Sequence, residues 1–263
     1  MKKGGGWMLG KDPSFRRVFA ADDIAEPLAS VKEGDAERAR MLFGTRNFDV
    51  IGYEEEGRVI GFLEKGQVGD FGDLKQSVRK FEVKHLISEN TDLLECLKLL
   101  QEKNRLFVIN KSEVDAIVTL ADIQKPAVRM LFFGIITFFE KNASRLIQEV
   151  FPDNSWTKVL PAHRREKAET TYQKLIERNT EIDLISCTQL SDKAGILEKD
   201  DLLRERYVQL SRTKAGKFFN RIIRLRDDLA HAQSLTVWFE EKEVTELMSM
   251  LIELTERINT RLS

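Results

Sequence analysis

Apolar and polar positions alternate between a helical period and a strand period in the first half of the chain. Apolar side chains three and four positions apart predict a helix over residues 35–46. Short runs rich in β-branched and aromatic side chains then predict strands at 47–53 and 58–63, joined by a turn in the sequence EEEG. The same order of helix, strand, turn and strand is predicted again over residues 91–120.

This second copy makes an internal repeat. Its predicted elements are a helix at 91–103 with Thr91 as its N-cap, a strand at 105–109, a turn at KSE and a return strand at 115–120. Units of one supersecondary pattern bury their apolar faces by packing against each other. We therefore expect an α+β domain over residues 13–125, with repeats at about 13–70 and 76–125.

From residue 126 onward the apolar pattern is helical throughout. Helices are predicted at 126–150, 164–179, 182–197, 202–210, 217–232 and 241–262. The segment PDNSWTKVLP, bounded by Pro152 and Pro161, predicts a loop, and the absence of proline after it favours a helical bundle. The most apolar run, residues 130–139, is too short to span a bilayer and predicts a buried helix. An all-α domain is expected over 126–263.

Composition narrows the classes of protein. The chain is 42% hydrophobic and 32% charged with a net charge of -1, which indicates a globular protein and excludes a generic binder of polyanions. Its two cysteines and three histidines have no disulfide, zinc or other metal-ligand spacing, so we expect no metal site and a reducing cytoplasm. Residues 1–12 lack the apolar core of a signal peptide and are expected to be flexible.

Positive charge is concentrated locally, because residues 204–226 contain eight basic side chains and one acidic one. A run of this kind is usually a solvated helix face, and it also fits a phosphate backbone. The candidate RNA-binding residues in this run are Arg212, Lys214, Lys217, Arg221 and Arg224.

The predicted helix at 217–232 carries a candidate catalytic group: Arg226, Asp227 and His231. Asp227 and His231 are four residues apart and share a helix face. Arg226 and His231 are five apart, so they reach a common site only through the length of the arginine or across a second copy of the helix. The alternative is an exposed arginine and a histidine favoured by the helix dipole.

The second repeat ends in AIVTLADI, which resembles the end of a cystathionine-β-synthase (CBS) domain. The resemblance implies a tandem pair that binds AMP, ADP, ATP or S-adenosylmethionine. Thr119 and Asp122 would contact the ribose hydroxyls. The base would be bordered by the backbone of Phe107, Val108 and Ile109.

The first repeat departs from this pattern, because Glu64 and Gln67 stand where the family has Thr and Asp. We therefore expect one competent nucleotide site. The alternative for Asp122 is that it caps the helix that begins near Pro126.

The helical half, with LRDDLAHAQ in a late helix, resembles the HEPN superfamily, marked by R-x(4–6)-H. The segment 183–197, ending TQLSDKAGIL, resembles the second core helix of abortive-infection-type members. The resemblance implies a homodimeric, metal-independent endoribonuclease that leaves 2′,3′-cyclic phosphate ends and needs no cofactor for catalysis. His231 would be the general acid or base, Arg226 would hold the scissile phosphate, and Asp227 would orient His231 or contact the ribose.

Together these observations predict a cytoplasmic protein in which an adenine-type nucleotide regulates RNA cleavage, in a toxin or defence role, without a membrane. The alternative is a non-catalytic nucleotide-sensing module that dimerises or serves as an adaptor.

Overall fold

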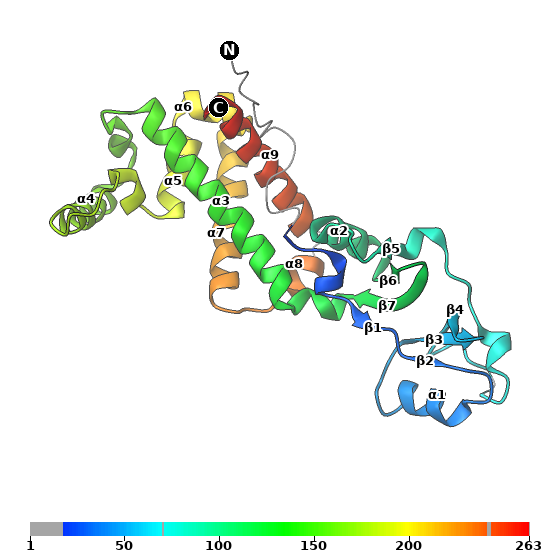
Figure 1. The fold of residues 1–263 in the computed structure, drawn as a ribbon. Coiled ribbons are helices and arrows are strands. Elements are labelled where there is room, and N and C mark those ends of the chain that lie inside the picture. The colour runs from blue at the N-terminus through cyan, green and yellow to red at the C-terminus, as the bar shows by residue number, and fades with distance from the viewer. Residues whose placement is uncertain (1–17, 70, 241–242, 263) are drawn as a thin grey trace, which may run out of the picture. The chain divides into compact units, whose positions relative to one another are not determined.

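The structure is a computed structural model that describes residues 18–69, 71–240 and 243–262. It contains two compact units, Arg16–Val128 and Arg129–Ser263 (Figure 1). The expected flexible segment, residues 1–12, lies outside the described residues.

Among its described residues, the N-terminal unit contains the α-helices α1 and α2, short 3-10 helices and two small sheets. Its elements are η2 (Ala21–Asp23), β1 (Glu26–Pro27), β2 (Ser30–Val31), α1 (Ala36–Phe43), β3 (Val50–Glu55), β4 (Arg58–Glu64), η3 (Leu74–Ser77), η4 (Val83–His85), β5 (Leu86–Ser88), α2 (Leu93–Lys103), β6 (Arg105–Asn110), β7 (Glu113–Thr119) and η5 (Leu120–Gln124). One sheet has the order β2-β3-β4 and the other β1-β7-β6-β5. In Figure 1, α1 covers one face of the three-stranded sheet.

The strand pairing confirms the predicted internal repeat. In each copy a short strand runs parallel to the next, which is antiparallel to the third: β2-β3-β4 and β5-β6-β7. A bulge follows Tyr53 in the first hairpin and Val108 in the second, 55 positions later. The two-residue turns of the hairpins are also 55 positions apart. Glu56 and Gly57 in the first turn, and Lys111 and Ser112 in the second, all have positive φ. The two hairpins therefore match residue by residue, and Glu64 is the counterpart of Thr119.

Two details of the prediction are wrong. The opening strands β2 and β5 were not predicted, because two or three residues give no alternating pattern. The N-cap of α2 is Asp92 rather than Thr91, since the Asp92 carboxylate accepts a hydrogen bond from the backbone N–H of Glu95 at 3.1 Å.

The core of this unit joins its two repeats. Leu28 and Phe62 lie in one buried cluster with Phe107 and Val114 of the second repeat. The rings of Phe62 and Phe107 are 4.8 Å apart, and Phe81 lies 4.7 Å from Phe107. Because each repeat supplies aromatic surface to the other, the pair forms a single compact body.

The described residues of the second unit form helices joined by short loops and turns, with no strand among them. Its elements are α3 (Pro126–Val150), η6 (Ser155–Val159), α4 (Ala162–Ile176), η7 (Leu184–Cys187), α5 (Leu190–Lys199), α6 (Asp201–Leu203), the π-helical η8 (Arg204–Val208), α7 (Arg212–Ala230), α8 (Thr236–Glu240) and α9 (Val244–Leu262). α3 packs along α7 and α8 through the ring pairs Phe139–Phe219 and Phe132–Phe239. No described helix is both long and apolar enough to cross a membrane.

Several boundaries in this unit correct the prediction. The helix expected at 182–197 is interrupted, because Thr188 and Gln189 are extended and Gln189 is the N-cap of α5. The expected loop at 152–161 contains the 3-10 helix η6, whose Trp156 is buried. The helix that carries Arg226 begins at Arg212 and ends at Ala230, and the separate helix α8 was not predicted.

Candidate functional site

Thr119 and Asp122 lie together at the end of the second repeat. The backbone N–H of Thr119 donates to Oδ2 of Asp122 at 2.7 Å, and the Thr119 hydroxyl donates to the same oxygen at 3.1 Å. Asp122 is buried and lies within η5, where the two residues form a capping box. The Asp122 carboxylate thus caps η5, its own 3-10 helix, rather than α3.

Lys125 forms an ion pair with Oδ1, the other carboxylate oxygen of Asp122. Its ammonium lies 3.1 Å from Asp122 Oδ1 and 2.5 Å from Glu26 Oε1, and it donates to the carbonyl oxygen of Ile24 at 2.6 Å. Burial lowers the pKa of Lys125, but the hydrogen bonds to Glu26 and Asp122 more than offset it, so the pKa is raised. A ligand hydroxyl that binds Asp122 therefore competes with Lys125.

The predicted base-binding backbone lies on an inner strand. β6 pairs with β5 on one side and β7 on the other, so its peptide groups take part in both ladders. Thr119 lies opposite Arg105, two residues from Phe107 and four from Ile109. At about 3.3 Å per residue, Ile109 lies about 13 Å along the strand from the level of Thr119. The Phe107 end of this segment is thus the nearer to Thr119.

Glu64, the counterpart of Thr119, is the centre of an ion cluster. Its carboxylate accepts hydrogen bonds from Arg79 and Arg105, one on each oxygen. The two guanidinium groups also lie over the ring of Phe62, at 5.6 and 5.9 Å from its centroid. At the end of the first hairpin, Glu64, Arg79 and Arg105 therefore bond to one another, whereas the matching position of the second hairpin is the neutral Thr119.

The end of α7 brings together two of the three predicted catalytic side chains. Arg226 Nε lies 3.3 Å from Asp227 Oδ1. His231 is the C-cap of α7, is exposed, and donates its backbone N–H to the carbonyl oxygen of Asp227 at 3.0 Å. The contact between Asp227 and His231 is therefore a main-chain one, and Asp227 pairs with Arg226 instead.

The predicted RNA-binding residues fall into two groups. Arg212, Lys214 and Lys217 are exposed on the first half of α7. Arg221 lies 2.5 Å from a carboxylate oxygen of Glu243, and both Arg221 and Arg224 lie over the ring of Trp238, at 5.9 and 5.2 Å. Trp238 of α8 was not predicted from the sequence to contact these arginines, because the contact forms only when α7 and α8 pack together.

The basic run is not one continuous face. Arg204 has only 12% of its side chain exposed and lies 2.6 Å from Asp201. It also donates to the carbonyl oxygen of Glu198 at 3.1 Å. This arginine stabilises the chain between α5 and η8, so it is unavailable to a nucleic acid.

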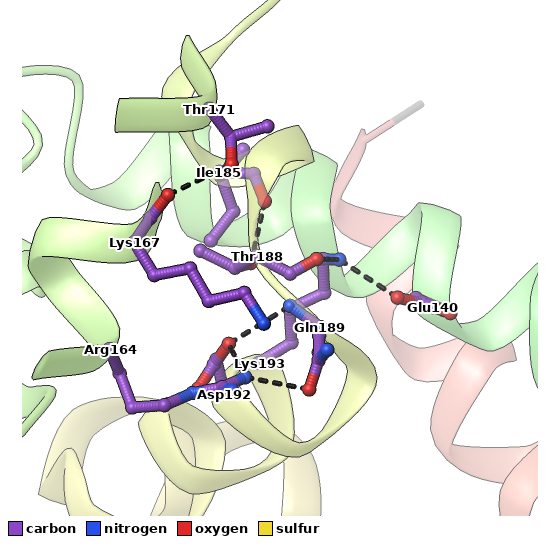
Figure 2. Close-up of polar contacts among 9 residues, drawn as sticks. All are labelled: Glu140, Arg164, Lys167, Thr171, Ile185, Thr188, Gln189, Asp192 and Lys193. Carbon is purple, nitrogen blue, oxygen red and sulfur yellow. Dashed lines mark hydrogen bonds and ion pairs between the residues drawn. The ribbon is translucent and has the colours of Figure 1, made fainter. Parts of the chain in front are cut away.

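A third polar site surrounds the start of α5 (Figure 2). Arg164 of α4 donates to both oxygens of Asp192, at 2.8 and 2.6 Å, and to Gln189 Oε1 at 2.8 Å. The backbone N–H of Gln189 donates to Asp192 at 2.9 Å. Burial raises the pKa of Asp192, whereas Arg164 and the Gln189 N–H lower it and prevail, so the carboxylate stays ionised.

Lys193, the next residue, is also buried in this site. Its ammonium donates to Glu140 Oε1 of α3 and to the carbonyl oxygen of Thr188, both at 2.9 Å. Glu140 and Lys193 line a groove of about 770 Å³ along α3. The segment TQLSDKAGIL, singled out in the sequence, contains Thr188, Asp192 and Lys193 of this network. Its residues Q-L-S-D place Asp192 three positions after Gln189, which is the spacing of a capping box.

Comparison with known proteins concerns the N-terminal part of the chain. No protein-family model and no curated protein matches this sequence. Solved structures that are similar include a CBS domain-containing protein of unknown function from Bacillus anthracis str. Ames Ancestor, with 11% identity over 41% of this chain and 91% of the other and a TM-score of 0.33. CBSX2 in complex with AMP has 16% identity over 43% and 98%, with a TM-score of 0.34. A conserved CBS domain protein of unknown function from Thermoplasma acidophilum has 14% identity over 43% and 74%, with a TM-score of 0.33.

Proposed function

We propose that the N-terminal unit binds an adenine-type nucleotide or S-adenosylmethionine at the end of its second repeat, and that this binding regulates RNA cleavage by the helical unit. The observation that carries the proposal is the asymmetry at the ends of two hairpins that match residue by residue. Thr119 is a neutral hydroxyl beside a buried carboxylate, whereas its counterpart Glu64 is held by two arginines. One ligand per chain is the expected stoichiometry.

The ligand site has the groups that a ribose needs. The carboxylate of Asp122 can accept hydrogen bonds from two neighbouring hydroxyls, and the hydroxyl of Thr119 can both donate and accept. In the structure these groups bond to each other and to Lys125. Binding therefore exchanges protein contacts for ligand contacts, which moves Lys125 away from Asp122 and changes the end of η5.

For the helical unit we propose a HEPN-like, metal-independent RNA cleavage. The 2′-hydroxyl of the RNA would attack the adjacent phosphorus and the 5′-oxygen would leave, giving a 2′,3′-cyclic phosphate. His231 is exposed, and an imidazole can both accept and donate a proton, which suits proton transfer to or from these oxygens. Arg226 would stabilise the phosphorane charge. Because Arg226 and His231 lie on different sides of one helix end, the proposed active site forms from two copies about a two-fold axis.

A non-catalytic sensing module is the second candidate, and two contacts favour it. Asp227 is paired with Arg226, which leaves His231 without the orienting carboxylate that catalysis would use. Arg221 is paired with Glu243 and Arg224 lies 4.0 Å from Asp228, which reduces the positive charge free to bind RNA. In this alternative the helical unit dimerises or binds a protein partner.

RNA cleavage by purified full-length protein in EDTA separates the two candidates. The variants Arg226→Ala and His231→Ala are compared with His163→Ala, which removes an exposed histidine of α4. The enzyme predicts cyclic-phosphate products from the wild type and His163→Ala, and a loss of at least about 100-fold in the other two. Absence of cleavage with AMP, ATP and S-adenosylmethionine alike would leave the sensing module as the function.

A further inference from the structure

The groove along α3 belongs to neither of the sites proposed above. It is a groove open to solvent, with a volume of about 770 Å³, between α3, residues 183–186 and the end of α9. This volume lies within the range of about 300–1,000 Å³ for small-molecule sites, which are usually lined by apolar side chains. Here Pro152, Ile185 and Leu262 are the apolar members of a described lining that is otherwise polar or charged. The groove therefore offers several charged and polar groups beside some apolar surface, which suits a small ligand with a charged group.

Lys193 supplies a buried positive charge to this groove. The residue is 3% exposed, and its ammonium donates to Glu140 and to the backbone of Thr188 (Figure 2). An ammonium has three N–H groups, and a buried charge is stabilised when all of them are bonded. Among the described residues Lys193 has these two acceptors, so its third N–H is available to an acceptor on a ligand.

The groove has more unpaired positive than negative charge. Glu140 is paired with the buried lysine, and Glu149 lies 3.1 Å from Arg261. Lys141 and Arg145 line the same groove, are exposed, and have no ionic partner in the described part of the chain. Two like charges four residues apart on a helix repel each other, so an anion bound between them is favoured.

Two acceptors on the wall indicate the rest of the ligand. Oε1 of Gln148 is buried and receives no hydrogen bond within the described residues. Asp183 contributes an exposed carboxylate at the edge of the groove. Hydroxyl or amino groups next to the anionic group would satisfy both.

We propose that this groove binds a small phosphorylated molecule. Its phosphate is held by Lys141, Arg145 and the third N–H of Lys193, and a neighbouring hydroxyl donates to Gln148 Oε1. A phosphate is favoured over a carboxylate because its three acceptor oxygens and larger charge match three cationic donors, one of them a guanidinium fork. This inference does not depend on nucleotide binding by the N-terminal unit or on RNA cleavage.

Isothermal titration of the full-length protein with inorganic pyrophosphate at constant ionic strength tests the proposal. The variant Lys141→Ala/Arg145→Ala removes two exposed charges. Its matched control, Lys167→Ala/Lys174→Ala, removes two exposed charges from α4. We expect saturable binding by the wild type and the control, and at least about tenfold weaker binding by the groove variant. Gln148→Ala leaves the hydrogen bonds of Lys193 intact. It is expected to weaken the binding of a hydroxyl-bearing phosphate ester more than the binding of pyrophosphate.

Failure of the wild type to saturate below about 10 mM pyrophosphate would overturn the proposal. Equal binding by the groove variant and its control would do the same. A third arm titrates single-stranded RNA. If the groove variant loses RNA binding while pyrophosphate gives no signal, the groove is a nucleic-acid surface and the small-ligand proposal is wrong.

Discussion

Asp192 illustrates how a buried charge is stabilised by partners from two elements. Arg164 forms a fork on both carboxylate oxygens, and the N–H of Gln189 adds a third hydrogen bond. Removing one partner of a buried pair leaves an uncompensated charge, which costs several kcal/mol. At the scale of single residues, this carboxylate connects α4 to α5.

The Asp192→Asn variant is predicted to lower the free energy of unfolding by about 3 kcal/mol at pH 7. The folded-state pKa of Asp192 is below its unfolded value of about 3.9, so its stabilisation is present above that pH and is lost as the pH falls through the folded-state pKa. Urea unfolding should therefore show a constant deficit above about pH 5 that shrinks below about pH 4.

Glu169→Gln is the control for this experiment, because Glu169 is exposed and lies 4.0 Å from Arg165. It should change the unfolding free energy by less than about 0.5 kcal/mol at every pH. A deficit in Asp192→Asn that stays the same from pH 7 to pH 3 would contradict the assigned role of the ionised carboxylate.

Glu64 is the second residue with a measurable energetic role. Replacement by Gln leaves Arg79 and Arg105 near each other without a counter-charge. Because the arginines keep 45% and 33% of their side-chain exposure, solvent screening moderates the cost, and we expect a loss of about 1–2 kcal/mol in urea unfolding. Glu113→Gln, at an exposed pair with Arg58, should lose less than about 0.5 kcal/mol. Equal losses in both variants would contradict a special role for the cluster.

At the scale of elements, the sequence predicted those helices and hairpins whose limits are set by neighbouring residues in the chain. α3 has its predicted limits because Pro126 suits the first turn of a helix and Pro152 restricts the residue before it. The hairpins of both repeats were predicted from their alternating residues. The break before α5 was not predicted, since apolar spacing continues across it and the Arg164–Asp192 contact depends on the fold.

The same limit applies to the candidate sites. Thr119 and Asp122 are three residues apart, so their contact follows from a local motif. The partners of Glu64 lie 15 and 41 positions away in sequence, and only the packed repeats bring them together. Local pattern therefore identifies the Thr119–Asp122 contact, but not the ion cluster around Glu64.

The two hairpin turns give a matched test of the repeat. Gly57 has φ of 81° and its counterpart Ser112 has φ of 79°, a region that favours glycine. Ser112→Gly is predicted to raise the unfolding free energy by about 0.5–1 kcal/mol, and Gly57→Ser to lower it by a similar amount. A Cβ at Gly57 meets nothing within 4 Å, so the change reports backbone conformation rather than a clash. Effects of the same sign in both variants, measured by thermal unfolding, would contradict the matched turns.

At the scale of the whole molecule, the proposed function requires the two units to be coupled. A nucleotide changes RNA cleavage only if it binds the active and inactive states with different affinity. In the proposed function, a ligand that competes with Lys125 for Asp122 would change the end of η5, two residues before α3 begins. Coupling of about 1–3 kcal/mol would alter the cleavage rate by about 5- to 150-fold if it acts on the active state.

The most direct test measures the initial rate of cleavage of a labelled single-stranded RNA in EDTA while AMP, ATP or S-adenosylmethionine is titrated. Wild type, Thr119→Val and the control Thr45→Val, at an exposed threonine of the first repeat, are compared. We predict a rate that changes along a saturable curve for the wild type and the control. In Thr119→Val the half-maximal concentration should be at least about tenfold higher. Rates that are the same at every ligand concentration, or cleavage that persists in His231→Ala, would contradict the account.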